Sequence, residues 1–408
     1  PLDGDGDGIA GGNFNFCFLA AAPVGVAATG QPRTLYVSKR FNSASPQNGS
    51  LSNPFNNIQA AINAARSGDI IRVVANGGLD NNISTLDDNF AYEIGNGGQV
   101  VGTLSDGVDL VVPAGVTLMI EAGVNLKFGN SRILVGSNDT TTDRSGAAIQ
   151  VLGTPERNVI FTAYTDESIG VDTNPLQTTP RPGDWGGIEI RNDFDNSQGR
   201  LNRERQGAFL NFIANADMRY GGGQVSIGGT PRVVNPIDLS EARATILNNT
   251  IANSADAAIA ADPNTFEETL FTEPRYQGNA PFRPDYDRVG PAIRGNVLRD
   301  NTINGLFVRV DTFAGQDPKE LTVTGRMDES DITIVMGENV LVRGTTGGPV
   351  AETAAPTVAL VVSRAVAPTA PNIGLPSGNY TYVMTFVDAF GSESLTSAVF
   401  GATGLTSR

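Results

Sequence analysis

Two stretches of this chain align with each other without a gap, and they constrain its architecture more than any other feature. Residues 246–259 read ILNNTIANSADAAI and residues 293–306 read IRGNVLRDNTINGL, at an offset of 47 (293 − 246). Their apolar positions coincide, Asn or Asp stands at the corners, and small residues lie between. Repetition of this kind predicts coils that stack along an axis, each burying its inward face on the next.

A shorter repeat indicates what one side of such a coil looks like. PAGVTLMI (113–120) is followed directly by EAGVNLKF (121–128), and their apolar residues coincide at a spacing of eight. The alternation predicts strands with Gly115 and Gly123 at corners, so the two segments are successive sides of one coil. One coil needs more than about 20 residues. The offset of 47 therefore means either two coils or one coil with an insert that includes 263–288.

Similar segments predict further strands and one helix. Asn53-Pro54 opens an amphipathic pattern that ends at Ser67-Gly68, and we expect this helix to cap the first coil, because an open solenoid end exposes sheet edges. The other strands are expected at 70–74, 133–135, 149–151, 159–161, 188–190, 209–212, 225–227, 306–310, 321–323, 332–334 and 340–342.

Composition excludes several classes of function. The 28 Lys and Arg residues against 43 Asp and Glu residues give a net charge of −15, which would repel nucleic acid and anionic membranes. The chain has no histidine, which excludes Ser-His-Asp and Cys-His catalysis and any His-ligated metal within it. No stretch is long and apolar enough to span a bilayer, so no membrane span is expected.

Residues 1–35 combine an acidic segment with an aromatic strand. Asp3, Asp5 and Asp7 alternate with glycines, which places three carboxylates where one Ca²⁺ would bind; a solvated acidic tail is the alternative. The segment resembles the DxDxDG linkers of calcium-binding surface proteins. The next strand has one aromatic face that must be covered by this chain or a neighbour. Its residues are Phe14, Phe16 and Phe18.

The composition changes again after residue 344. Residues 345–357 read as a linker rich in Gly, Pro and Thr, and residues 358–408 as a small module. A strand with alternating large side chains is expected there, followed by a turn and a second strand at 395–400; the large residues are Tyr380, Tyr382, Met384 and Phe386. GNYTYVMTFVDAFGSES resembles the middle strands of a fibronectin-III-type sandwich, although so short a segment cannot close one.

The coil region itself carries a family resemblance. YVSKRFNSASPQNGSLSNPFNNIQAAINAARSGDIIRVV (36–74) resembles the start of pectin-lyase-like right-handed parallel β-helices. VTLMIEAGVNLKFG, AAIQVLGTPERNVIFTAYTD and GDWGGIEIR resemble β-helix modules of very large bacterial surface proteins. The resemblance covers about residues 36–344 and is specific for fold. It implies little about activity, because this fold hosts lyases, hydrolases, adhesins and inert shafts.

The enzymatic hypothesis rests on a few carboxylates. The polygalacturonase type needs a Gly-His-Gly segment that is absent here, whereas the pectate-lyase type uses Asp-bound Ca²⁺ and an Arg base. Asp193 and Asp195, close to Arg191, are the candidates for such a site. On a strand these two carboxylates would face one side and could hold a metal, a sugar or a proton. Arg309 and Asp311 offer similar groups. The alternative is that these residues are ordinary turn residues of the coils.

Trp185 and several asparagines also have two interpretations. Trp185, the only tryptophan, would stack on a sugar if exposed, but its neighbours favour a buried residue that anchors a coil. The asparagines would contact a ligand or, as we expect, cap and ladder the coil corners. They are Asn248, Asn249, Asn296 and Asn301.

These observations predict an all-β protein: a right-handed parallel β-helix (solenoid) at 36–344, with a short capping helix and a small β-sandwich-like, fibronectin-III-like segment at 358–408. We expect a non-enzymatic, extracellular structural protein of bacterial origin, either the shaft of a larger surface protein or a subunit of a head-to-tail filament. Its partners would then be copies of itself or neighbouring domains of a longer chain. The alternatives are a polysaccharide lyase or hydrolase, a carbohydrate-binding β-helix, and an adhesin.

Overall fold

The chain divides into two compact units, Pro1–Val342 and Arg343–Arg408. The computed structural model describes residues 32–39, 46–76, 90–95, 106–107, 109–137, 141–169, 179–195, 203–204, 208–227, 229–269, 288–310, 320–325, 327 and 329–342, and the backbone of two strands at 378–382 and 400–405. Within these ranges the chain is rich in β-strand and has one α-helix.

Three parallel sheets form the body of the described part of the first unit. Sheet 1 contains, in order, β1 (Thr34–Val37), β2 (Ile70–Val73), β5 (Thr117–Glu121), β8 (Ala148–Leu152), β11 (Phe212–Ala214), β16 (Thr245–Leu247) and β21 (Ala292–Arg294). Sheet 2 contains β3 (Tyr92–Gly95), β6 (Asn125–Gly129), β9 (Val159–Ala163), β12 (Ala216–Arg219), β17 (Thr250–Ala252) and β22 (Val297–Arg299). Sheet 3 contains β4 (Leu110–Val112), β7 (Ile133–Gly136), β10 (Ile188–Arg191), β15 (Ile237–Ser240), β18 (Ala257–Ala261), β23 (Ile303–Val308) and β24 (Ile334–Met336).

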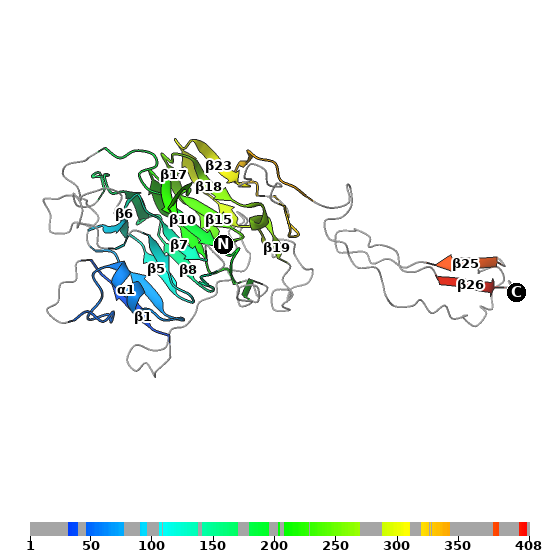
Figure 1. The fold of residues 1–408 in the computed structure, drawn as a ribbon, viewed down its shortest axis with the longest axis horizontal. Coiled ribbons are helices and arrows are strands. Elements are labelled where there is room, and N and C mark those ends of the chain that lie inside the picture. The colour runs from blue at the N-terminus through cyan, green and yellow to red at the C-terminus, as the bar shows by residue number, and fades with distance from the viewer. Residues whose placement is uncertain are drawn as a thin grey trace. The chain divides into compact units, whose positions relative to one another are not determined.

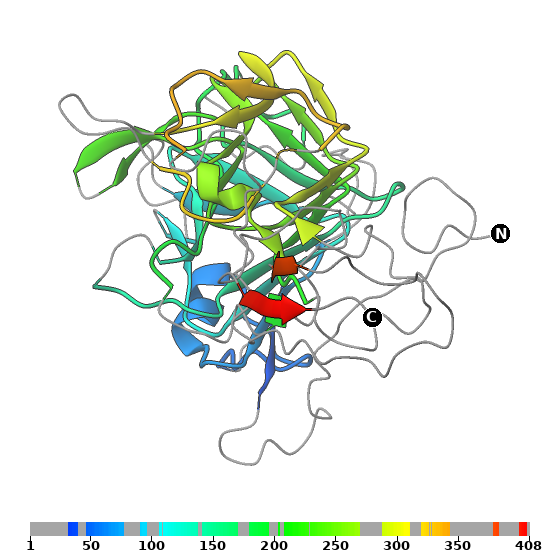
Figure 2. The same cartoon turned by 90° about the vertical axis from the view of Figure 1, so that its right-hand side faces the viewer.

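The chain visits these sheets in the same order in successive turns. From β5 in sheet 1 it passes to β6 in sheet 2 and β7 in sheet 3, and β8 then returns to pair with β5. The turns therefore stack in sequence order, and the ribbon colour in Figure 1 runs from blue to yellow along the body. Figure 2 shows the same succession from bottom to top. The predicted stacking of parallel strands is confirmed, and the arrangement is compatible with a parallel β-helix or solenoid.

The offset of 47 corresponds to one turn with an insert. Ile246 pairs with Ile293 between β16 and β21, and Thr250 pairs with Val297 between β17 and β22. Between the two copies lie the short 3₁₀ helix Pro263–Phe266 and the antiparallel pair β19 (Glu268–Thr269) and β20 (Arg288–Val289). Of the two interpretations of the offset, the structure therefore selects a single turn whose connection carries an excursion.

The core is built from rows of apolar side chains that face inward at equivalent places in successive turns. One row crosses all seven strands of sheet 1, and each member has at most 1% of its surface exposed. Burial of each such side chain contributes about 1.5–3 kcal/mol, so the row ties the turns together along the whole stack. Its members are Val37, Val73, Ile120, Val151, Ile213, Ile246 and Ile293.

The observed helix α1 is shorter than the sequence pattern predicts. Helix α1 spans Ile58–Ala64, and Asn57 caps it by accepting a hydrogen bond from Ala60 N at 2.7 Å. The expected start at Asn53-Pro54 is therefore wrong, because Asn53 forms an isolated bridge with Ser50 and the helix begins only at Ile58. Ile58, Ala61 and Ile62 are buried, and α1 contacts β1, β2 and β4 in the first turns.

Several other expected strands differ from those observed. The segment at 225–227 belongs to an antiparallel hairpin of β13 (Gln224–Ile227) and β14 (Thr230–Val233), not to a coil. The segment at 209–212 is a strand only from Phe212 onward, and around 321–323 and 340–342 only an isolated bridge joins Glu320 to Leu341. In the second unit, β25 (Gly378–Tyr382) pairs antiparallel with β26 (Phe400–Leu405), so the second strand there begins where it was expected to end.

Candidate functional site

The outer face of sheet 3 holds charged residues that are unexpectedly buried. In β10 the alternation places Ile188 and Ile190 in the core, so Glu189 and Arg191 point away from it. Yet Glu189 is only 1% exposed and Arg191 only 8%. A buried charge is stable only when it is paired and hydrogen-bonded, so the partners of these two side chains define the chemistry of this face.

Three arginines surround the carboxylate of Glu189. Arg132 Nη1 donates a hydrogen bond to Oε2, and Arg191 Nη1 donates to Oε1 at 3.1 Å. Arg232, which belongs to β14, places its Nη1 3.8 Å from the same Oε1. Charge-assisted hydrogen bonds of this kind are about twice as strong as those between neutral groups. Glu189 thus links Arg132, which directly precedes β7, to its own strand β10 and to the β13–β14 hairpin.

A second carboxyl group lies beside the first. The register of β10 and β15 places Asp238 directly next to Glu189 on the neighbouring strand, and Asp238 is 5% exposed. Its Oδ2 accepts a hydrogen bond from Asn235 N at 3.2 Å. Burial, followed by the charge of Glu189, raises the pKa of Asp238 to about 7, although Arg232 and Arg309 act in the opposite direction.

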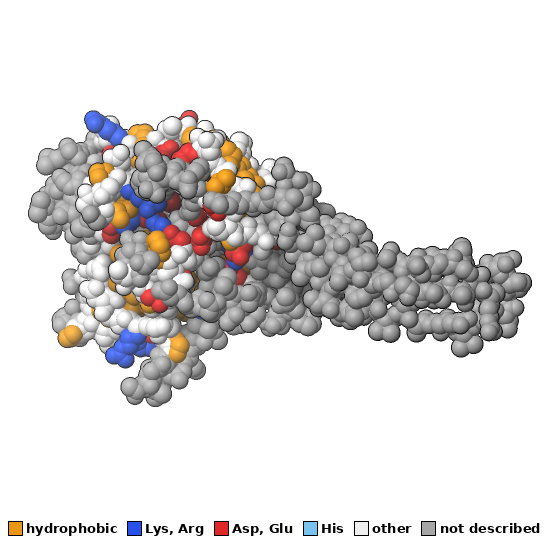
Figure 3. All heavy atoms as spheres, turned by 45° about the vertical axis from the view of Figure 1, so that its right-hand side comes forward, with side chains coloured by type: hydrophobic (Ala, Val, Ile, Leu, Met, Phe, Trp, Pro, Cys, Tyr) orange, Lys and Arg blue, Asp and Glu red, His pale blue; other side chains and the backbone are white. Residues whose placement is uncertain are grey.

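Further ion pairs extend from this centre. Arg309 Nη2 donates to Asn235 Oδ1 at 2.9 Å and to Asp256 Oδ2 at 2.8 Å, while Arg132 Nε lies 3.3 Å from Asp109 Oδ2. Basic and acidic side chains also lie next to one another near the middle of the face shown in Figure 3. We call this set the outer charge cluster: Glu189, Asp238, Asp109, Asp193, Asp256, Arg132, Arg191, Arg232 and Arg309.

Asp193 belongs to this cluster, and Asp195 lies close by, but neither is on a strand. Both follow β10 in a turn in which Asp195 N donates to Asn192 O at 3.1 Å, so the expectation of two carboxylates on one strand face is wrong. Asp193 Oδ1 accepts from Arg191 Nε at 3.0 Å, and Ser137 Oγ lies 3.5 Å from Asp195 Oδ1. Burial lowers the pKa of Arg191, but hydrogen bonds and charges from Asp193 and Glu189 raise it overall. The carboxylate of Asp193 is therefore already engaged by a cation.

Trp185 lies in the core, where it does not present its ring to a ligand. Its side chain is 0% exposed and stacks on Phe128, with ring centroids 4.4 Å apart and planes inclined by 16°. Its Nε1 donates to Arg219 O at 2.7 Å, which satisfies the indole donor. The burial of Trp185 therefore agrees with the second interpretation, a core residue that anchors a coil.

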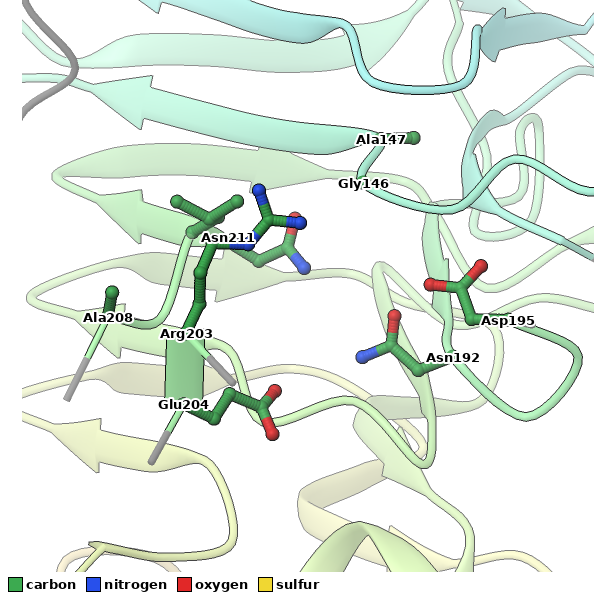
Figure 4. Close-up of a pocket in the computed structure, with 9 residues that line it drawn as sticks. Gly146, Ala147, Asn192, Asp195, Arg203, Glu204, Ala208 and Asn211 are labelled. Atoms are coloured by element: carbon green, nitrogen blue, oxygen red, sulfur yellow. The ribbon is translucent and has the colours of Figure 1, made fainter. Parts of the chain in front are cut away.

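A small cleft opens near Asp195 at the edge of the coils. It has a volume of about 30 Å³, which holds one or two water molecules but not a sugar ring. Figure 4 shows the Arg203 and Glu204 side chains on one side, with Asn192 and Asp195 across from them. The Glu204 carboxylate is already bound by Arg243. The other lining residues are Gly146, Ala147, Ala208, Leu210 and Asn211.

Several predicted site residues lie outside the described ranges. These are the proposed calcium ligands Asp3, Asp5 and Asp7, the aromatic residues Phe14, Phe16, Phe18, Met384 and Phe386, and Asp311. Tyr380 and Tyr382 are on β25, for which only the backbone is described. Among the described residues, no three His, Cys, Asp or Glu side chains converge to hold a metal ion. No helix in these same ranges has the length and apolar character needed to cross a membrane.

The pair at the centre of the cluster is not among the residues predicted from the sequence. Glu189 and Asp238 stand in IEIR (188–191) and IDLS (237–240), two segments that alternate apolar and charged residues in the same way. An alignment of these two segments was the available signal. The hairpin inserted at 224–233 hid it, because the offset is 49 (238 − 189) and does not match the 47 of the clearer repeat.

Comparison with known proteins adds no assignment: the chain matches no family model, no curated protein and no solved structure.

Proposed function

We propose that this chain is a non-enzymatic structural module of an extracellular bacterial protein, with a right-handed parallel β-helix that serves as a shaft or as a subunit of a head-to-tail filament. The observation that carries the proposal is the pairing of charges within the outer charge cluster. A catalytic or binding groove keeps polar groups accessible for its ligand. Glu189, Arg132 and Arg191 are instead buried and bound to one another.

The two ends of the stack support the same role. Helix α1 contacts the first strands of sheets 1 and 3, and we propose that it caps the shaft there. At the other end, side chains occupy backbone amides in β21 and just after it: Ile293 N lies 3.4 Å from Glu329 Oε1, and Gly295 N lies 2.9 Å from Asp331 Oδ2. Occupied edges disfavour uncontrolled strand pairing, which is what a shaft of fixed length requires.

Head-to-tail assembly would use the parts of the chain beyond the shaft. The aromatic strand with Phe14, Phe16 and Phe18 and the segment after residue 357 both look incomplete by their sequence. In this proposal the aromatic strand of one copy pairs with the segment after residue 357 in the next copy. Such a heterologous contact propagates into a filament. The competing arrangement, in which both fold back on the same chain, predicts a monomer.

Electron microscopy and sedimentation of the purified chain test this proposal. We expect filaments, and we expect deletion of residues 1–19 to leave monomers of unchanged circular dichroism. The control replaces Asp3, Asp5 and Asp7 with Asn at full length: if Ca²⁺ supports assembly, this variant and EDTA treatment act alike. Filaments that persist after the deletion would contradict assembly through the aromatic strand. Release of unsaturated products from pectate or alginate with Ca²⁺, abolished by Asp193→Ala, would contradict the non-enzymatic role.

A further inference from the structure

The neighbouring carboxyl groups of Glu189 and Asp238 are the least expected feature of the described residues. They lie side by side on adjacent parallel strands, and both are almost fully buried. Two carboxylates at neighbouring positions of this kind repel each other, and such a pair holds one proton more firmly than either group alone. Their surroundings decide which of the two groups carries it.

The arginines are distributed unequally between the two carboxyl groups. Glu189 receives hydrogen bonds from Arg132 and Arg191 and has Arg232 within 3.8 Å. Asp238 has a hydrogen bond from Asn235 N, and Arg309, which lies nearby, is itself bound to Asp256. The proton of the pair therefore belongs on Asp238, the carboxyl group with fewer cationic partners. The raised pKa of Asp238, caused by burial and then by Glu189, agrees with this assignment.

One short segment contacts both carboxyl groups. Arg232 Nη1 lies 3.8 Å from Glu189 Oε1. Asn235, three residues further on, donates its backbone N–H to Asp238 Oδ2. The same segment forms the base of the β13–β14 hairpin, where Val234 N donates to Gly223 O at 3.1 Å. A second negative charge at Asp238 needs solvent, and moving this segment is the smallest change that admits it.

We propose that Glu189 and Asp238 together form a proton-binding site, and that release of its proton as the pH rises loosens the segment from Arg232 to Asn235 and the base of the β13–β14 hairpin. The charged groups that face the pair from the described residues all take part. These groups are Arg132 and Arg191 toward Glu189, Arg232 toward both, and Arg309 toward Asp238, with Asp109, Asp193 and Asp256 behind the arginines.

Amide hydrogen exchange between pH 5.5 and 8.5 tests the proposal, with each rate divided by its intrinsic value at that pH. In the wild-type chain we expect protection at Val234 and Asn235 to fall by about tenfold or more, since one pKa unit of coupling is a tenfold effect. In Asp238→Asn this pH dependence should vanish. Asp217→Asn is the matched control, because Asp217 is bound to Arg219 on sheet 2 and should leave the dependence intact.

A direct titration of Asp238 in the wild-type chain tests the proton-binding site even if Asp238→Asn does not fold. The ¹³C carboxyl signal of Asp238 should titrate with a midpoint above pH 6. A midpoint below pH 5 would overturn the proton-binding site. Protection that stays constant with pH in the wild type, or a dependence that survives in folded Asp238→Asn, would overturn the link to the hairpin.

Discussion

Asn249 and Asn296 lie directly above one another in consecutive turns, because Asn296 Oδ1 is 2.9 Å from both N and Nδ2 of Asn249. Asn249 extends the ladder by accepting from Ala216 N at 2.8 Å and donating to Ile213 O at 3.0 Å. Asn296 Nδ2 donates to Ile246 O at 2.9 Å. The predicted ladder of corner asparagines is confirmed here, and its side chains supply hydrogen bonds to backbone groups of the neighbouring turns.

Replacement of Asn249 should therefore weaken the stack well beyond the loss of one side chain. Asn249→Ala removes the partners of Ala216 N and Ile213 O, and a buried polar group left unsatisfied costs about 1–3 kcal/mol. We expect the free energy of unfolding in urea to fall by about 2–4 kcal/mol. Asn56→Ala, at an exposed position before α1, is the control and should change it by less than about 0.5 kcal/mol. Equal effects of the two variants would contradict a structural ladder.

The close stacking of successive turns leaves no room for a side chain at Gly136. This residue has φ +85°, and a Cβ on it would lie 1.8 Å from Arg191 O of the next turn. Gly229 has nearly the same φ, +83°, but nothing lies within 4 Å of the corresponding position. Gly229→Ala should lower the free energy of unfolding by about 1–2 kcal/mol from backbone strain alone. Gly136→Ala should lower it much further or abolish folding.

Thermal melting of both glycine variants measures the difference. Because their backbone angles match, any excess in Gly136→Ala reports the contact with Arg191 and not the strain. Similar melting temperatures for the two variants would show that the turns can separate to admit a methyl group, and so would contradict the tight register of β7 and β10.

The sequence predicted the stacked strands because inward positions repeat their apolar character. Ile246 and Ile293 fall in register both in the aligned sequence and in the paired strands. The turns nevertheless differ in length: Ile70 to Thr117 is 47 residues, whereas Thr117 to Ala148 is 31. Core rows tolerate such variation, because the paired strands keep their register whatever the number of residues between them.

The variable length of the turns is also why the contacts of the outer charge cluster could not be predicted. Its contacts join residues far apart in sequence, such as Arg132 and Glu189, whose proximity depends on the lengths of several irregular connections. Outward charged residues normally face water, so IEIR and IDLS gave no indication that Glu189 and Asp238 are buried. The position of Asp193 in a turn agrees with the alternative interpretation of this residue, but its ion pair with Arg191 has no signal in the sequence.

Trp185 offers a test through its own fluorescence. It is the only tryptophan, so the emission of the folded chain reports its surroundings alone. Because it is buried against Phe128, we expect a blue-shifted maximum and no quenching by iodide. Trp185→Ala should lower the free energy of unfolding by about 3–5 kcal/mol. An emission change on adding an oligosaccharide would instead indicate a sugar platform.

Asp69 and Asp238 should give the chain opposite dependences on pH. Burial raises the pKa of Asp69, but hydrogen bonds from the Arg33 side chain and from Arg66 N and Arg33 N lower it below 3.8 overall. Stability from this group is therefore present above pH 3.8 and is lost as the pH falls further. Asp238 has a folded-state pKa of about 7, so its native state binds a proton that the unfolded chain releases. Stability from Asp238 thus declines as the pH rises from about 4 to about 7.

The two Asp→Asn variants separate these contributions. At pH 8 we expect Asp69→Asn to lower the urea midpoint, because the Arg33 ion pair at 2.5 Å is lost. Asp238→Asn should raise the midpoint at pH 8 and leave it nearly unchanged at pH 4.5, because Asn mimics the protonated acid. Measured from pH 3 to 9, the wild-type profile should rise on the acid side and fall toward neutrality. Asp238→Asn should remove only the fall, and a midpoint that it lowers at pH 8 would show that Asp238 is stabilising as an anion.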